Sequence, residues 1–170
     1  ISQSLTTVEE MAFLCDKHHK IPVVYLSMGF GNPYGDAWSH EIVVHWVGEL
    51  TKRGIKILSI ADTIGVSTPD KINYLLQHLI EIFPTIEFGV HLHSTPSSWK
   101  EKIDAAYKSC CKRFDTALKG FGGCPMATDE LTGNIATENV IGYLNDKGEV
   151  LDLNMDKWQE ALEYSTKIFK

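Results

Sequence analysis

Features that mark several common classes of protein are missing from this sequence of 170 residues. No apolar run approaches the roughly 20 residues of a membrane span, and the first residues show no signal-peptide pattern. The net charge is −6 and no basic block is present, which argues against nucleic acid as the main partner; with no apolar run of spanning length, no membrane partner is expected either. The four cysteines form no C-x-x-C pair, so a reducing cytosol fits best and we expect a cytoplasmic protein.

What is present indicates one globular domain over residues 1–170, because hydrophobic residues make up 44% and charged residues 22%. Apolar residues recur alternately at helical and strand-like spacing. The predicted elements are helix 6–19, strand 21–28, helix 39–53, strand 55–61, a helix from Pro69, strand 86–92, helix 97–112, strand 114–118 and helices 137–146 and 154–169. The predicted helix caps are Thr6, Thr68, Thr137 and Asn154.

Strands separated by helices predict an α/β fold with a parallel sheet. The strands recur about every 30 residues, which is the size of a βα unit. Four such units would form about half of a (βα)₈ TIM barrel, with flanking helices, or a small open doubly wound sheet. No G-x-G-x-x-G follows the first predicted strand, so nothing supports a dinucleotide site. A half-barrel has two unpaired strand edges, so the barrel interpretation requires a second half.

His91 and His93 end the third predicted strand with one residue between them. Positions i and i+2 of a strand point to the same face, so the two imidazoles are expected side by side. That is the geometry of a pair of metal ligands, although two unrelated histidines would give the same pattern. The other five histidines are expected in solvent; these are His18, His19, His40, His45 and His78.

Three more polar residues follow strands of the predicted sheet: Asp62, Cys124 and Asn134. Each has a simpler interpretation, as a helix cap, a structural thiol and a turn residue respectively. Strand carboxyl ends meet at one edge of a parallel sheet, however, and that edge holds the site in such proteins. If a carboxylate joins the histidines and the amide, Mg²⁺ or Mn²⁺ fits; with Cys124 as a ligand, zinc competes.

These residues lie in motifs that resemble those of the 3-hydroxy-3-methylglutaryl-CoA (HMG-CoA) lyases, within the superfamily of metal-dependent TIM-barrel lyases and acyl-CoA condensing enzymes. The motifs are Asp62-Thr-Ile-Gly-Val66, His91-Leu-His93, Gly120-Phe-Gly-Gly-Cys-Pro125, Thr132-Gly-Asn-Ile-Ala-Thr-Glu138 and, less specifically, Gly29-Phe-Gly-Asn-Pro-Tyr-Gly35. The His-x-His pair is shared across the superfamily, whereas the Gly-Gly-Cys-Pro loop is more specific to the lyases. The resemblance covers nearly the whole chain and implies the second half of the barrel.

The resemblance also implies roles for individual residues. His91, His93 and Asn134 would be ligands of Mg²⁺ or Mn²⁺, and His91 would also transfer a proton. Asp62 would be a carboxylate needed for catalysis, and Cys124 would be the catalytic cysteine on a mobile loop. The implied reaction is cleavage of an acyl-CoA thioester, HMG-CoA, to acetyl-CoA and acetoacetate, in leucine breakdown. The intact protein is expected to be a homodimer.

Two departures from the family pattern are visible. Ser94 stands where the family usually has an acidic residue after the second histidine. The family's Arg-Asp pair, with its metal-binding Asp, and its catalytic glutamate belong to the first four strands and have no counterpart here. Losing that arginine removes a kind of contact worth roughly 3–4 kcal/mol of barrier, so this segment alone is expected to be inactive or nearly so.

Two alternatives remain open at this stage. Another enzyme of the superfamily, such as a condensing synthase or a 2-oxo acid aldolase, would keep His91, His93 and Asn134 but would not need Cys124. A non-catalytic α/β module that completes a barrel with another chain is the second alternative.

Overall fold

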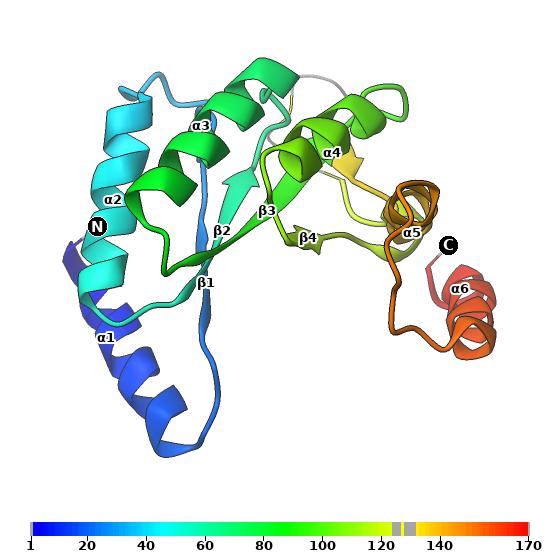
Figure 1. Ribbon diagram of the computed structural model, residues 1–170, viewed down its shortest axis with the longest axis horizontal. Coiled ribbons are helices and arrows are strands. Elements are labelled where there is room, and N and C mark those ends of the chain that lie inside the picture. Colours follow the sequence, from blue (N-terminus) through cyan, green and yellow to red (C-terminus); the bar gives the residue numbers. More distant parts are fainter. Residues whose placement is uncertain (1, 124–126, 128–131, 170) are drawn as a thin grey trace.

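The computed structural model describes residues 2–123, 127 and 132–169, and it confirms the predicted alternation of helices and strands (Figure 1). The helices are α1 (Ser2–Lys17), α2 (His40–Lys52), α3 (Pro69–Ile82), α4 (Trp99–Lys108), α5 (Thr137–Asp146) and α6 (Met155–Ile168), with a short 3₁₀ helix, η1 (Leu118–Gly120). The strands are β1 (Val23–Leu26), β2 (Ile57–Asp62), β3 (Glu87–Ser94), β4 (Arg113–Asp115) and β5 (Gly133–Asn134). No helix within the described ranges has the length and apolar character needed to cross a membrane.

The sheet is parallel and its strand order, β1-β2-β3-β4, follows the chain. A doubly wound sheet reverses its strand order at a switch point, whereas a barrel adds each strand beside the last. The observed order therefore favours a barrel-type sheet over the doubly wound alternative. Strand β5 was not predicted; it has two residues and pairs antiparallel with the end of β3.

The core lies between the sheet and the helices that follow its strands. Figure 1 shows α2, α3 and α4 along one side of the sheet. Along β3, the buried side chains Phe88, Val90 and Leu92 belong to the apolar core. Because side chains alternate along a strand, His91 and His93 point to the opposite face. The helical side of the same core consists mainly of Val43, Val47, Leu50, Ile72, Leu75, Leu76, Leu79, Ile103 and Ala106.

Two of the four predicted helix caps are confirmed. The side chains of Thr68 and Asn154 accept hydrogen bonds from the backbone N–H three residues further on, at 3.3 and 3.0 Å. The prediction for Thr6 was wrong, because α1 already includes Ser2 and Thr6 lies inside it. The prediction for Thr137 was also wrong, because Thr137 is itself the first helical residue.

Two helices end earlier than predicted because a non-glycine residue adopts a left-handed conformation. His19 (φ 52°) closes α1 and Cys110 (φ 63°) closes α4. In both cases the next backbone N–H bonds a carbonyl five residues earlier, at 2.8 and 3.1 Å. This is the helix-ending hydrogen bond that usually has glycine at the left-handed position, so residue types alone did not predict it.

Candidate metal and catalytic site

The two histidines of β3 lie beside each other at the carboxyl end of the sheet, as predicted. Their ring centroids are 5.1 Å apart, with an angle of 67° between the rings. The ring of His91 also contacts Tyr25 of β1, at 6.0 Å. Burial and the neighbouring His93 lower the pKa of His91, while Asp115 opposes this shift. His91 therefore favours the neutral form, which is the form that binds a metal or accepts a proton.

Strand β5 brings Asn134 directly opposite His93. The side-chain N–H₂ of Asn134 donates to the carbonyl of Phe121 at 2.9 Å. This hydrogen bond uses the nitrogen of the amide and does not involve its oxygen, Oδ1. Gly122 makes this arrangement possible: its φ is +99°, and a Cβ there would lie 2.7 Å from Asn134 Nδ2. The glycine-rich loop therefore packs closely around the amide. Asn134 is a strand residue opposite His93, and the simpler interpretation of it as a turn residue was wrong.

Two buried atoms at this edge favour a cation ligand. His93 Nδ1 and Asn134 Oδ1 are both buried, and neither has a hydrogen-bond partner among the described residues. Leaving such atoms unsatisfied costs free energy, so each requires an explanation. A divalent ion accepts both an imidazole nitrogen and an amide oxygen, so His91, His93 and Asn134 fit the implied metal. No group of three His, Cys, Asp or Glu side chains suited to a metal occurs within the described ranges, so further ligands would come from outside them.

Asp62 lies at the same edge, where it ends β2, but its carboxylate is fully buried and engaged. One oxygen accepts from the N–H of Val66 at 2.9 Å, and the other accepts from the N–H of Ser67 at 3.0 Å and from its hydroxyl. The second oxygen also pairs with Lys102 Nζ at 3.0 Å. This set of contacts favours a role in positioning the loop after β2 over direct contact with a substrate.

Cys124, the predicted catalytic thiol, lies outside the described residues. The loop that leads to it can be placed, because Gly123 forms an isolated bridge with Gly133 of β5. The start of the loop therefore runs beside Asn134.

Sequence reasoning missed a second polar group on the histidine face. Ser59 of β2 donates to Asp115 of β4 at 2.6 Å, and Asp115 stands opposite His91 in the register. Burial, followed by Asp115, raises the pKa of Tyr25. The position of Asp115 at the end of its strand could have marked it as a site residue, because Asp62 ends β2 in the same way. Strand β4 is so short that its end could not be located from periodicity.

Two cavities differ in their relation to this site. One of about 260 Å³ adjoins Asn134 and is also lined by Ser94, Trp99 and Lys119. An apolar cavity of about 410 Å³ lies between α1, β1 and α2. It contains none of the five predicted site residues, whereas the smaller cavity is lined by Asn134.

The prediction that the remaining histidines are solvated holds for His18, His19 and His45, which are exposed, and only in part for His78, which is half-buried. It was wrong for His40. Its Nε2 is buried without a hydrogen-bond partner among the described residues, and its ring contacts those of Trp38 and Tyr74 at 5.0 and 4.6 Å. Aromatic neighbours from the loop before α2 and from α3 pack against this half-buried ring, and helical spacing alone does not reveal them.

The described thiols should differ strongly in reactivity. Burial raises the pKa of Cys111 to about 11, whereas Cys110 is exposed. Because the thiolate is the nucleophile, iodoacetamide at neutral pH should modify Cys110 about 100-fold faster or more. Peptide mass mapping over time measures both rates, and equal rates would contradict the buried position of Cys111. Alkylation tests of Cys124 therefore need a background without Cys110 and without the partly exposed Cys15.

A parallel sheet in chain order, with polar residues gathered at its carboxyl edge, places the chain in the class of barrel-type α/β proteins. The family model described as HMGL-like matches residues 4–164. The chain belongs to the HMGL-like family.

Among its relatives, the human cytoplasmic 3-hydroxy-3-methylglutaryl-CoA lyase is 32% identical over 98% of this chain and 45% of its own length. The (R)-citramalyl-CoA lyase of Chloroflexus aurantiacus is 30% identical over 74% of this chain and 39% of its own length. The crystal structure of the Bacillus subtilis HMG-CoA lyase superposes with a TM-score of 0.88 at 28% identity, over 98% of this chain and 56% of that one. The chain thus spans about half the length of these relatives.

Proposed function

We propose that the whole protein containing this chain is a divalent-metal-dependent carbon–carbon lyase that cleaves HMG-CoA to acetyl-CoA and acetoacetate. The observation that supports this most directly is the pair of buried, unpartnered atoms, His93 Nδ1 and Asn134 Oδ1, at the carboxyl edge of the sheet. In this proposal the chain supplies four βα units, the second half of a TIM barrel, and is inactive or nearly so alone.

His91, His93 and Asn134 would hold Mg²⁺ or Mn²⁺. The chemistry that such an ion supplies when bound is polarisation of the substrate oxygens and a lower pKa of the substrate hydroxyl. His93 and Asn134 face each other across β3 and β5, so the pairing of these strands fixes their separation. His91 is half-buried beside them, so part of its side chain stays accessible.

His91 would also move the first proton. Its lowered pKa keeps the imidazole neutral. The single lone pair of a neutral imidazole either binds the ion or takes a proton, so His91 would accept the proton of the substrate's C3 hydroxyl when this nitrogen is not on the ion. The electron pair of that O–H bond forms the ketone of acetoacetate as the C2–C3 bond breaks, and the bond's electrons become the enolate of acetyl-CoA. The thiol of Cys124 would then give its proton to the enolate carbon. Asp62 would act through the buried loop that it holds.

A second candidate is the cleavage of (R)-citramalyl-CoA, favoured by the relative from Chloroflexus aurantiacus at a similar identity. Both substrates are tertiary alcohols that carry a CoA thioester, and both lose acetyl-CoA on cleavage, so the residues above would serve either reaction. The substituents on the carbinol carbon decide between the two. As further proposals, the protein is a homodimer, and its location is that named for the human relative, the cytoplasm.

The test is an assay of acetyl-CoA release from each thioester, with Mg²⁺ or Mn²⁺ present. It compares the whole barrel protein with the purified 170-residue chain. We expect the whole protein to cleave HMG-CoA faster than (R)-citramalyl-CoA, to stop when the metal is chelated, and to lose activity when Cys124 is alkylated. Release of acetyl-CoA from neither substrate would overturn the proposal, and turnover by the homogeneous 170-residue chain would overturn the half-barrel part of it.

A further inference from the structure

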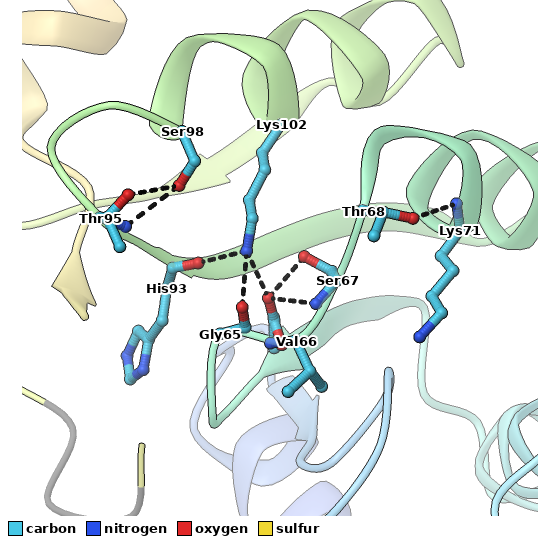
Figure 2. A network of polar contacts seen from close by, with 10 residues as sticks. Gly65, Val66, Ser67, Thr68, Lys71, His93, Thr95, Ser98 and Lys102 are labelled. Carbon is cyan, nitrogen blue, oxygen red and sulfur yellow. Dashed lines mark hydrogen bonds and ion pairs between the residues drawn. The ribbon is translucent and has the colours of Figure 1, made fainter. Parts of the chain in front are cut away.

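A buried lysine lies directly behind the proposed metal ligands. Lys102 belongs to α4, and only 5% of its side chain is exposed. Figure 2 shows the side chain running down from the helix to a point where several polar groups meet. Nothing in the motifs above involves this residue.

All three N–H donors of the Lys102 ammonium are matched by an acceptor from a different position. They bond Asp62 Oδ2 at 3.0 Å, the carbonyl of Gly65 at 3.1 Å and the carbonyl of His93 at 2.8 Å. A lysine ammonium has three donors, so the group is saturated. A charge this deeply buried is tolerated because the fully buried carboxylate of Asp62 compensates it.

We infer that Lys102 is a positioning residue of the proposed metal site, which it aligns through the main chain of His93. The inference rests on the proposed function. The carbonyl that Lys102 binds belongs to the same residue whose imidazole would bind the ion, and Figure 2 shows the imidazole directed away from the ammonium. Fixing this peptide fixes the direction in which the His93 side chain leaves the strand.

The same ammonium links His93 to the loop after β2. Asp62 holds that loop through the N–H groups of Val66 and Ser67, and Lys102 binds both Asp62 and Gly65. The end of β3 is therefore tied to the end of β2 on one side, while β5 pairs with it on the other. With both sides held, His93 and Asn134 face each other at a fixed distance before any ion binds.

A purely structural role for Lys102 makes a different prediction. If the ion pair only stabilises the packing of α4 on β2, its removal lowers the free energy of unfolding but leaves the metal site of the folded molecules unchanged. If Lys102 aligns His93, the folded molecules bind the metal more weakly and with altered geometry. Metal affinity and a metal spectrum separate the two, because neither depends on the free energy of unfolding once the protein is folded.

The experiment uses the whole barrel protein with Lys102→Met, which keeps an unbranched side chain, one heavy atom shorter, and removes its donors. The matched control is Lys100→Met, the same change at an exposed position of α4. Calorimetry measures the dissociation constant for Mn²⁺, and absorption spectroscopy of the Co²⁺-loaded protein reports the ligand geometry. We expect Lys102→Met to raise the dissociation constant about 10- to 100-fold, as for other groups that orient metal ligands, and to shift the Co²⁺ bands. Lys100→Met should match the wild type in both.

The outcomes distinguish the two proposals. Wild-type affinity and spectrum in folded Lys102→Met would overturn the role of Lys102 and leave the lyase proposal standing. No binding of Mn²⁺ by the wild-type protein would overturn both. If Lys102→Met does not fold, the Asp62→Asn/Lys102→Gln variant removes both charges and keeps hydrogen-bonding side chains. The same two measurements on that variant then decide, with weakened binding and shifted bands expected.

Discussion

Replacement of His93 by alanine should raise the dissociation constant for Mn²⁺ by more than about 100-fold and abolish measurable lyase turnover in the whole barrel protein. The expected loss exceeds the 10- to 100-fold that follows removal of a group that only orients a ligand, because the substitution removes a ligand itself. It also leaves Asn134 Oδ1, already buried and unpartnered among the described residues, without the ion. Calorimetry gives the affinity, and acetyl-CoA release gives the turnover.

His18→Ala is the matched control, since it makes the same change at an exposed histidine. It should leave affinity and turnover at their wild-type values. If His93→Ala bound Mn²⁺ as tightly as the wild type, His93 would not be a metal ligand, and the ion would bind at another place in the protein.

Asp62→Ala should lower the free energy of unfolding by about 3–5 kcal/mol, the range for removing one partner of a buried ion pair. The large effect follows from burial, because 0% of the Asp62 side chain and 5% of the Lys102 side chain are exposed. The substitution leaves the Lys102 ammonium without its counter-charge and removes the acceptor of two backbone N–H groups in the loop after β2. Urea denaturation followed by circular dichroism measures the change.

A double-mutant cycle completes this test. In Asp62→Ala/Lys102→Met neither charge remains, so the double variant should be less destabilised than the sum of the single variants by about 0.5–3 kcal/mol. Additive losses would show that the two side chains do not interact in solution. A loss below about 1 kcal/mol for Asp62→Ala alone would show that its carboxylate is solvated, contrary to the structure.

The sequence predicted the order and type of the main helices and strands correctly, because hydrophobic periodicity and helix caps are local signals. Thr68 and Asn154 are examples of caps read correctly. The failures are also local in origin. Cys110 closes α4 with a left-handed conformation that usually belongs to glycine, and β5 is two residues long, which is too short to show any periodicity.

For the candidate site, the sequence by itself determined that His91 and His93 share a face, because the spacing of two residues in a strand dictates it. It also determined that polar residues collect where the strands end. Only the tertiary structure decided that Asn134 stands opposite His93, since the two residues are 41 positions apart in the chain. Only the tertiary structure could pair Asp62 with Lys102, which are 40 residues apart. Such pairings depend on how strands and helices meet in space, and no period or motif in a single sequence encodes which distant side chain fills a given buried position.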